Sequence, residues 1–499
     1  MKILSATQTK AVDAYTIANE PISSVDLMER ASASFADWFT TKFQSDKSVI
    51  IFCGTSNNGG DGLAIARMLH EKKYAIEVYV VYYSTNTSAD FSTNYKRLEP
   101  LGIIKAIHKA ADIPLLSEES IIIDAIFGSG LSRPAEGIAA EVISALNKSN
   151  AIKVAIDIPS GLYVDAYNSS SHIVEADYTI SFQLPKLSFL LPQNFRYVGE
   201  WSLTNIGLHP EGIKEAKTNN FYIDDDLINS LVKKRNKYDH KGSFGHALII
   251  AGSYGKMGAA QLAAKACLTT GIGLLTTYIP ECGYEIMQIA IPEAMTLTDP
   301  DAKLISEIPV LEKFTAIGIG PGLGTDEATA KAMDVLFQAY HSPVVVDADG
   351  LNILAKNRNL LNQLPPGSIL TPHPKEFERL AGETANEYER LEALQNFAQQ
   401  YQVIVVLKGA HSAIATPAGK VYFNSTGNPG MATGGTGDVL TGIITSLLAQ
   451  KYTPEAAAIT GVYFHGLAGD YAVKENGYSA LTASHIISYL SQAFIQYNL

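Results

Sequence analysis

A glycine-rich stretch near the end of the chain has the residue types and spacing of an anion-binding site. Five glycines and one proline fall between Gly427 and Gly437, and Asp438 follows them. Apolar side chains then recur at helical spacing from Val439 to Leu448, so a helix is predicted to begin where the glycines end. Unpaired N–H groups and a partial positive charge at a helix start bind anions. A capped turn would explain Gly-Thr-Gly-Asp alone, but the longer stretch indicates an anion-binding site. There Asp438 either only favours the first helical turn or also acts as a base beside a phosphate.

A second glycine-rich segment, Gly54-Thr-Ser-Asn-Asn-Gly-Gly-Asp-Gly62, lies early in the chain. It follows the apolar run 49–53, which is typical of a buried parallel strand. Helical spacing resumes over 63–69 and a second strand is predicted over 75–82. This order of strand, loop, helix and strand builds doubly wound sheets. The loop has neither a dinucleotide-binding nor a P-loop pattern, so we interpret it as another kind of phosphate-binding loop, with a flexible surface turn as the alternative.

Polar residues end two further predicted strands in the same half of the chain. Residues 121–124 end at Asp124, and residues 154–157 end at Asp157, with Ser160 close behind. Ligands of open α/β sheets gather at the carboxyl ends of the strands, so these side chains and Asn58 are expected to converge. Their hard oxygen atoms suit a cation such as K⁺ as well as a substrate hydroxyl.

The elements that must position these residues form two α/β halves. Two amphipathic helices are predicted over 9–19 and 24–43, ahead of the first strand. The pattern is interrupted near residues 208–225 and restarts with a strand at 247–251. We therefore place one domain at 1–212 and a second at 222–499. His465 falls inside an apolar helical pattern, where we expect a hydrogen-bonded core or packing role.

Composition limits the classes of function. The 499 residues are 46% hydrophobic, carry a net charge of −12 and contain no basic run, so nucleic acid is not an expected partner. The three cysteines lack the spacing of a disulfide framework or a zinc site. No signal-peptide core and no apolar run of membrane-spanning length is visible, so we expect a cytoplasmic protein with no membrane contact.

Four segments together resemble the bifunctional NAD(P)H-hydrate repair enzyme family. They are 54–62, Asp157-Ile-Pro-Ser-Gly161, Lys408-Gly-Ala-His-Ser412 and Asn428-Pro-Gly-Met-Ala-Thr-Gly-Gly-Thr-Gly-Asp438. The resemblance covers nearly the whole chain and implies a Rossmann-like three-layer αβα domain followed by a ribokinase-like α/β domain. It implies that the first domain interconverts the R and S epimers of hydrated NAD(P)H. The second would dehydrate the S form, using ADP and releasing AMP and phosphate.

The resemblance gives the residues of the first domain their roles. It implies a K⁺ site at Asn58, Asp124 and Ser160, and a part for Asp157 in the proton transfer of epimerisation. Because a carboxylate with an ordinary pKa near 4 is a weak base at neutral pH, the environment of Asp157 must matter. The implied substrate positions are Asn57, Asn58, Gly59, Gly60, Asp61, Gly128, Ser129, Gly130, Leu131, Ser132, Arg133, Pro134 and Asp157.

The second domain carries the implied ADP-dependent chemistry. Asp438 matches the acidic residue that takes the hydroxyl proton in kinase relatives, and Mg²⁺ is expected with the nucleotide. Further substrate positions are implied at Gly258, Gly322 and His373, besides Asp438. The implied ADP-binding positions are Lys408, Gly409, Ala410, His411, Ser412, Asn428, Gly434, Gly435, Thr436 and Gly437.

Two departures and two alternatives accompany the resemblance. Lys375 stands where many relatives have glycine, and Met257 lies in a loop that carries a proline in the family. A small-molecule kinase would use the same phosphate site and base as the second domain, but would not need the first domain. A non-catalytic nucleotide sensor would not need both Asp157 and Asp438. Related enzymes form homo-oligomers, which we also expect here.

Overall fold

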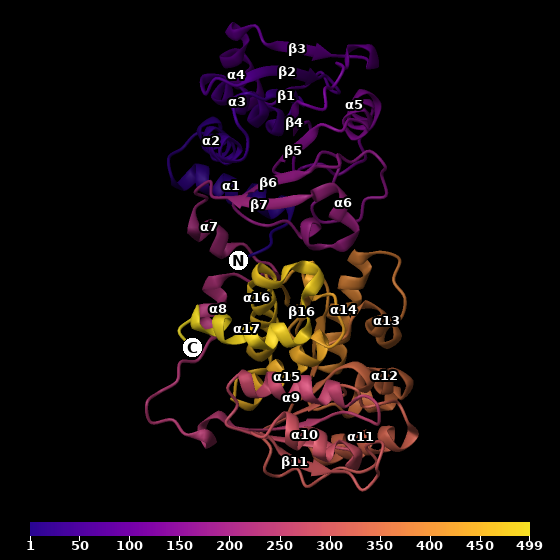
Figure 1. The fold of residues 1–499 in the computed structure, drawn as a ribbon. Coiled ribbons are helices and arrows are strands. Elements are labelled where there is room, and N and C mark those ends of the chain that lie inside the picture. Colours follow the sequence, from indigo (N-terminus) through magenta and orange to yellow (C-terminus); the bar gives the residue numbers. More distant parts are fainter. The chain divides into compact units, whose positions relative to one another are not determined.

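The computed structural model describes all residues from Met1 to Leu499, and the chain divides into two compact units (Figure 1). The N-terminal unit comprises residues 2–218 together with 386–388. The C-terminal unit comprises Met1, 219–385 and 389–499. The change from one unit to the other falls between Thr218 and Asn219, inside the interruption near residues 208–225.

The N-terminal unit is built on a seven-stranded parallel sheet in the order β3-β2-β1-β4-β5-β6-β7. The strand order reverses beside β1, between β1 and β4, which is where ligands bind in open α/β sheets. The strands are β1 Ser48–Cys53, β2 Ala75–Val81, β3 Ile104–Ile107, β4 Ile121–Ala125, β5 Ile152–Ile156, β6 Tyr178–Phe182 and β7 Glu200–Thr204.

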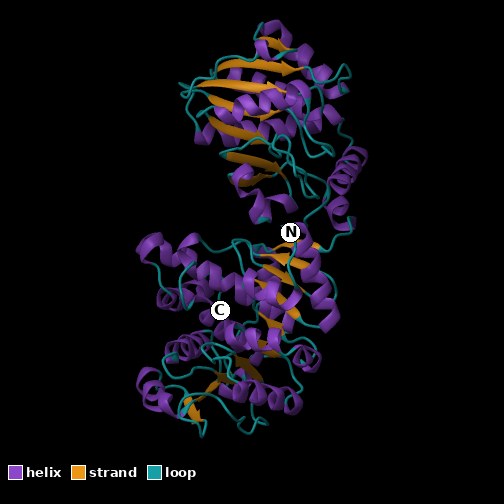
Figure 2. Cartoon of the chain, turned by 90° about the vertical axis from the view of Figure 1, so that its right-hand side faces the viewer, coloured by secondary structure: helices purple, strands orange, loops and turns teal.

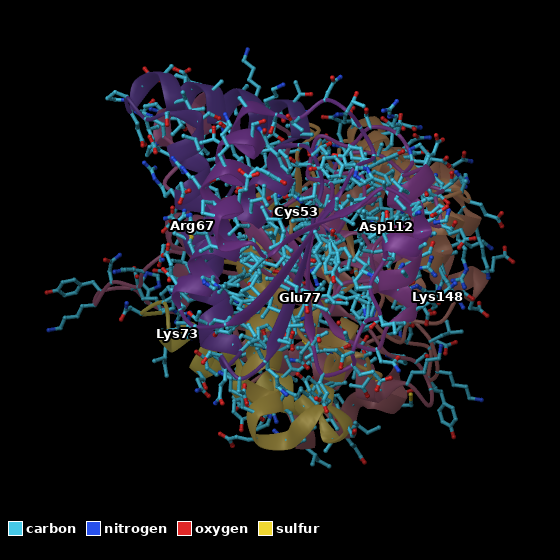
Figure 3. All side chains as sticks on the ribbon, turned by 90° about the horizontal axis from the view of Figure 1, so that it is seen from above. Cys53, Arg67, Lys73, Glu77, Asp112 and Lys148 are labelled. Carbon is cyan, nitrogen blue, oxygen red and sulfur yellow. The ribbon has the colours of Figure 1, made fainter.

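Helices cover both faces of this sheet. Side chains of α2, α3 and α4 pack with Val49, Ile51 and Cys53 of β1, whereas α5 packs with Ile50 and Phe52 on the opposite face. Figure 3, which looks onto this unit, labels the buried Cys53. The expected three-layer α/β architecture is confirmed. The helices are α1 Ala6–Asn19, α2 Ser24–Lys42, α3 Asn57–Glu71, α4 Ala89–Leu98, α5 Gly137–Lys148, α6 Phe195–Val198 and α7 Pro210–Glu215.

The C-terminal unit contains a ten-stranded sheet in the order β11-β10-β9-β12-β13-β14-β15-β16-β17-β8. Every neighbouring pair is parallel except the two pairs made by β16, which forms the predicted hairpin with β17. The strands are β8 Asn220–Tyr222, β9 His246–Ile250, β10 Leu274–Ile279, β11 Met295–Thr298, β12 Ala316–Ile319, β13 Val344–Val346, β14 Ile369–Leu370, β15 Ile404–Leu407, β16 Ala413–Ala415 and β17 Val421–Phe423.

One large apolar cluster joins this second sheet to α9, α15, α16 and α17. Alternate side chains on the strands, such as Leu248 and Ile250 of β9, are also fully buried, so both faces are covered. Figure 2 shows the two sheets as separate stacks of strands with helices along each. The helices are α8 Asp225–Leu231, α9 Met257–Thr269, α10 Tyr284–Ala290, α11 Glu327–Ala339, α12 Ala348–Lys356, α13 Pro374–Ala381, α14 Glu387–Tyr401, α15 Thr436–Ala449, α16 Pro454–Ala480 and α17 Ala483–Ile495. None of the helices combines the length and the apolar character that crossing a bilayer requires.

Candidate active sites

The glycine-rich segment after β1 is not the long loop that the sequence predicts. Only Gly54, Thr55 and Ser56 connect β1 to α3, and Asn57 already begins the helix. Glycine favours loops, but here it permits close packing of a helix on its sheet. A Cβ at Gly59 would lie 1.9 Å from the Gly54 carbonyl oxygen, and one at Gly62 would lie 2.6 Å from Ala125 Cβ. The N–H groups of the first turn of α3 are therefore presented at the end of β1, where they can bind an anion.

The residues predicted to bind K⁺ lie together at this edge of the sheet. Ser160 donates hydrogen bonds to Asp124 through both N–H (2.7 Å) and Oγ (2.6 Å). The N–H of Phe127 donates to Ser160 Oγ at 2.8 Å, and its carbonyl accepts from Asn58 Nδ2 at 2.9 Å. This arrangement leaves Asn58 Oδ1 without a hydrogen-bond donor. Burial raises the pKa of Asp124 to about 6, although hydrogen bonds from Ser160 oppose the shift.

The loop that carries the predicted substrate positions 128–134 starts beside the same cluster. A Cβ at Gly128 would lie 3.2 Å from Asn58 Cβ, so the loop and the start of α3 are in contact. The N–H of Leu131 donates to the Gly128 carbonyl in a turn, and the side chains from Ser132 to Pro134 are exposed. The structure thus brings the start of the loop to the cation cluster and leaves its tip at the surface.

Asp157 follows β5 and forms an ion pair with Lys186, a residue that the sequence analysis did not select. Lys186 Nζ lies 2.5 Å from Asp157 Oδ1, and both side chains are largely buried. Burial raises the pKa of Asp13, on α1, to about 6, with Asp157 adding to the shift and Lys186 opposing it. Burial also raises the pKa of Asp61 well above its ordinary value, and the charges of Asp157 and Asp13 add to this. The carboxyl groups of Asp13 and Asp61 are therefore close enough to Asp157 for its charge to raise their pKa values, and Lys186 pairs with Asp157 and acts on Asp13.

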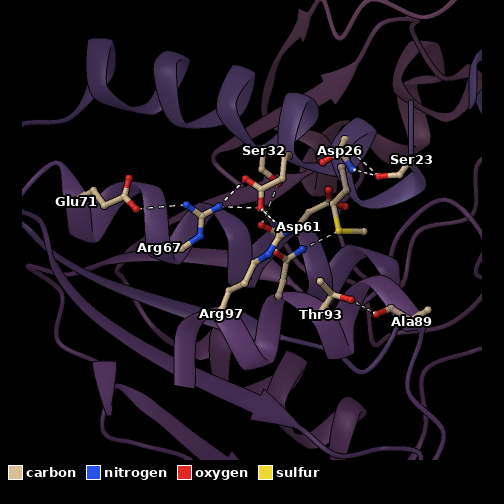
Figure 4. Close-up of polar contacts among 12 residues, drawn as sticks. Ser23, Asp26, Ser32, Asp61, Arg67, Glu71, Ala89, Thr93 and Arg97 are labelled. Carbon is tan, nitrogen blue, oxygen red and sulfur yellow. Dashed lines mark hydrogen bonds and ion pairs between the residues drawn. The ribbon is translucent and has the colours of Figure 1, made fainter. Parts of the chain in front are cut away.

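Figure 4 shows how the helix that carries Asp61 is held. Arg67, on the same helix, pairs with Glu29 of α2 at 2.5 Å, and Arg97 of α4 pairs with the same carboxylate at 2.7 Å. Ser32 Oγ of α2 donates to the Asp61 carbonyl oxygen at 3.4 Å. These contacts fix α3 against its neighbouring helices and so fix the position of its first turn.

In the C-terminal unit, the start of α15 lies against a buried ion pair. Lys408 Nζ donates to Asp347 Oδ1 at 2.8 Å, and Thr441 Oγ1 donates to Oδ2 of the same carboxylate at 2.8 Å. A Cβ at Gly437 would lie 3.3 Å from Lys408 Nζ, so glycine lets the helix start approach this pair. The prediction that Asp438 occupies the first turn of a helix is confirmed, because α15 begins at Thr436. Burial raises the pKa of Asp438 to about 6, with Asp347 adding to the shift and Lys408 opposing it.

The other predicted C-terminal substrate positions are Gly258, in the first turn of α9, Gly322, in the loop after β12, and His373, between β14 and α13. Ser253, in the loop before Gly258, donates from Oγ to the Gly322 carbonyl at 2.8 Å, so the two glycine-containing loops are in contact. His373 caps α13, accepting from the N–H groups of Lys375 and Glu376 through Nδ1. The other ring nitrogen of His373 lies 3.4 Å from Glu376 Oε1, and Glu376 Oε2 lies 4.0 Å from Lys408 Nζ. Lys375 itself is exposed.

The predicted ADP-binding segments form two ordered turns. After β15, Ser412 Oγ accepts from the Gly409 N–H at 3.2 Å, and His411 Nδ1 lies 2.9 Å from the Asn424 carbonyl oxygen. Asn428 donates from Nδ2 to Asp470 Oδ1 at 2.9 Å, which ties its loop to α16. Gly435 adopts a positive φ of 92° as the cap of α15. Ala410 and Gly434 lie within these two turns.

His465 lies on α16, and only one of its ring nitrogens departs from the expected hydrogen-bonded core or packing role. Its Nε2 is buried and makes no hydrogen bond. Burial lowers the pKa of His465 to about 4, Lys408 adds to this shift, and the backbone of Thr436 opposes it. The neutral ring therefore lies near the start of α15 and the predicted nucleotide site.

Comparison with known proteins matches a different family model to each half of the chain. A family model described as the YjeF-related protein N-terminus matches residues 24–188, and one described as NAD(P)H-hydrate dehydratase matches residues 247–492. The bifunctional NAD(P)H-hydrate repair enzyme of Moorella thermoacetica is 36% identical, over 98% of this chain and 96% of its own. This chain belongs to the bifunctional NAD(P)H-hydrate repair enzyme family. The family member of Thermofilum pendens is 34% identical over 99% of this chain and 96% of its own.

Solved structures resemble the C-terminal part. The ADP/ATP-dependent NAD(P)H-hydrate dehydratase of Bacillus subtilis, co-crystallised with ATP and Mg²⁺, is 31% identical with a TM-score of 0.51. The match covers 56% of this chain and 100% of the Bacillus subtilis chain. A ribokinase-like superfamily protein of Enterococcus faecalis is 28% identical with a TM-score of 0.50, over 56% of this chain and 97% of its own. The expected ribokinase-like fold of the second half is thereby confirmed.

Proposed function

We propose that this repair enzyme restores hydrated nicotinamide cofactors at two sites. The N-terminal domain, which we place at residues 1–212, interconverts the R and S epimers of hydrated NAD(P)H. The C-terminal domain, which we place at residues 222–499, dehydrates the S form with ADP and releases AMP and phosphate. Family membership along nearly the whole chain supports both activities. The single structural observation that carries the proposal is Asp438 in the first turn of α15, beside Lys408.

The geometry of the C-terminal site supplies what phosphoryl transfer requires. The unpaired N–H groups at the start of α15 and the ammonium of Lys408 stabilise negative charge on the ADP phosphates. Asp438 accepts the proton of the ring hydroxyl as that oxygen attacks phosphorus. Elimination of phosphate from the ring then regenerates the dihydronicotinamide. Gly322 and His373, which follow β12 and β14, are proposed to bind the substrate.

Mg²⁺ accompanies the nucleotide in this proposal. No three histidine, cysteine or carboxylate side chains form a metal-binding group in the structure. Mg²⁺ usually keeps several waters and binds through one or two carboxylates and substrate phosphates, so this site does not need a protein cage. The co-crystals of the Bacillus subtilis dehydratase with ATP and Mg²⁺ support the assignment.

The test of the C-terminal proposal is the Asp438→Asn variant, which removes the base but keeps the shape of the side chain. Dehydration of the S epimer should be abolished, while ADP still binds with nearly unchanged affinity in calorimetry. Retained turnover would refute the role of Asp438. A wild-type enzyme that phosphorylates a simple hydroxyl substrate but never turns over the hydrated cofactor would favour the kinase alternative.

The oxygen cluster of the N-terminal unit fits K⁺. It offers one carboxylate from Asp124 and the neutral oxygens of Ser160, Asn58 and the Phe127 carbonyl, which suits a singly charged cation. These residues would hold K⁺ beside the first turn of α3, where it supplies positive charge near the substrate phosphates. Replacing Na⁺ by K⁺ at equal ionic strength should raise the melting temperature of the N-terminal unit, and Asp124→Asn should remove the difference. An equal melting temperature in Na⁺ and in K⁺ would refute the site.

The homo-oligomeric state and the cytoplasmic location stay predictions.

A further inference from the structure

Lys186 is a buried cation whose ammonium group meets the predicted catalytic carboxylate. Lys186 as a whole is 5% exposed. Its Nζ donates to Asp157 Oδ1 and to Ser181 Oγ, each at 2.5 Å. The ring of Phe189 lies 5.7 Å from the ammonium and shields it on one side. A buried lysine costs free energy unless it is paired, so this contact determines where the side chain lies.

The two oxygens of Asp157 have different environments. Oδ1 accepts from Lys186, from the Phe182 N–H at 3.2 Å and from Ser181 Oγ at 3.4 Å. Oδ2 makes no hydrogen bond, and the side chain keeps 15% of its surface exposed. One oxygen is therefore fixed by three donors, while the other is free to meet a ligand.

The backbone dihedral angle φ of Asp157 also differs from that of the strand that precedes it. Its φ is +65°, a left-handed conformation that residues other than glycine rarely adopt, although aspartate does so more readily than most. The N–H of Asp157 donates to the Ile180 carbonyl at 2.8 Å, which holds the residue in this conformation. Strain of this kind is concentrated at functional sites, where the surrounding contacts maintain it.

Lys153, a second buried lysine in the same unit, has a structural role and serves as a comparison for Lys186. Lys153, on β5, is 8% exposed, and its Nζ donates to the carbonyls of Ser149 and Ala151 at 3.1 and 3.0 Å. Its nearest carboxylate, Asp177, is 4.0 Å away and half exposed. Lys153 thus closes a turn of the backbone, whereas Lys186 contacts side chains around a carboxylate with one open oxygen.

We infer that Lys186 is the positioning residue for Asp157 in epimerisation, because it fixes Oδ1 and leaves Oδ2 open to the substrate hydroxyl. The inference rests on the proposed epimerase function. As Oδ2 accepts the hydroxyl proton of the hydrated ring, the C–O bond becomes a carbonyl and the adjacent ring C–N bond breaks, leaving its electron pair on nitrogen. The nitrogen then attacks the opposite face of the carbonyl, the C–N bond reforms with the inverted configuration, and Oδ2 returns the proton to the oxygen, so the step consumes no proton and no co-reactant. Lys186 donates hydrogen bonds throughout and does not itself touch the reacting carbon.

The test compares Lys186→Ala and Lys186→Arg with the matched control Lys153→Ala, all in the full-length chain. Conversion of the R epimer into the S epimer is followed by chromatography without ADP. General acid–base groups contribute about 100-fold or more, so Lys186→Ala should lose about 100-fold in kcat with KM nearly unchanged. Lys186→Arg should recover part of this loss, and added methylammonium should partly restore Lys186→Ala. Lys153→Ala should keep the wild-type rate.

Three outcomes would overturn the inference. The first is an unchanged kcat in Lys186→Ala. The second is a loss of kcat in Lys186→Arg and in Lys153→Ala that is as large as the loss in Lys186→Ala. The third is a loss of kcat in Lys186→Ala that methylammonium does not restore. If Lys186→Ala unfolds, Lys186→Met keeps the volume of the stem and is measured in its place. Failure of the proposed function is distinguishable, since the wild-type chain would then show no epimerisation at all. ADP-dependent dehydration of the S epimer, measured on each variant, reports that the C-terminal unit is intact.

Discussion

The base role that we propose for Asp438 depends on its position in the fold. An ordinary aspartate has a pKa near 4 and is a weak base at neutral pH. Burial at the start of α15 raises its pKa to about 6, with Asp347 adding to the shift. A base whose pKa is closer to the working pH takes a proton more effectively. Lys408 limits the shift, so the carboxyl remains ionised at neutral pH.

The pH dependence of dehydration follows from this shift. Asp438 must be ionised to accept the hydroxyl proton, so kcat/KM for the S epimer should fall as the pH drops below about 6. The profile is measured with saturating ADP, and the ADP affinity at each pH is the control. A profile that stays flat down to about pH 5 while ADP binding is unchanged would contradict the role of Asp438.

Single residues could be selected as candidates where they belong to a sequence motif. Asp157, Asp438 and the residues proposed to bind K⁺ stand at strand ends or in glycine-rich segments, and these local patterns indicate ligand sites. Asp13 and Lys186 were missed because their partners are distant in sequence. Lys186 stands alone in the apolar segment 184–191, and that isolated charge was the one available signal.

At the scale of elements, the sequence indicated most strands but misplaced the start of α3. Asn57, Asn58 and the glycines that follow have poor helix propensity, which favours a loop. In the structure, close packing of α3 on β1 and β4 overrides this propensity. The short strand β8 was also missed, because three residues carry no periodic pattern and its pairing with β17 is distant in sequence.

The packing of α3 predicts the effect of Gly59→Ala. The new Cβ would lie 1.9 Å from the Gly54 carbonyl oxygen, so the helix must move away from β1. We expect a loss of about 1–3 kcal/mol in the stability of the N-terminal unit, which corresponds to about 2–4 °C per kcal/mol in calorimetry. Epimerisation should fall and dehydration should remain. Gly130→Ala is the matched control for stability, since a Cβ there meets nothing within 4 Å. Equal melting temperatures for the two variants would contradict this packing argument.

At the scale of the whole molecule, each candidate site is contained in one compact unit. Asp157 and the K⁺ cluster lie within residues 2–218, and Asp438 with Lys408 lies within the C-terminal unit. The sequence indicated two α/β halves because the alternation of strands and helices is interrupted once, near residues 208–225. The inclusion of residues 386–388 in the first unit was not predictable, because no local pattern links them to the N-terminal half.

This containment predicts separable variants. Asp157→Asn should abolish conversion of R to S and leave dehydration of the S epimer unchanged. Asp438→Asn should abolish dehydration of the S epimer and leave conversion of R to S unchanged. Each rate is measured on a purified epimer, with ADP present only in the dehydration assay. Loss of both activities in either variant, with both units still folded by calorimetry, would contradict independent sites.

The central claim is that one chain both epimerises and dehydrates hydrated nicotinamide cofactors. The most direct measurement follows the near-ultraviolet absorbance of NADH in a mixture of R and S hydrated NADH, with ADP, Mg²⁺ and K⁺. We predict complete recovery of NADH, beyond the S fraction and faster than spontaneous epimerisation allows. Recovery that stops at the S fraction would contradict the epimerase assignment, and no recovery with ADP or ATP would contradict the repair function.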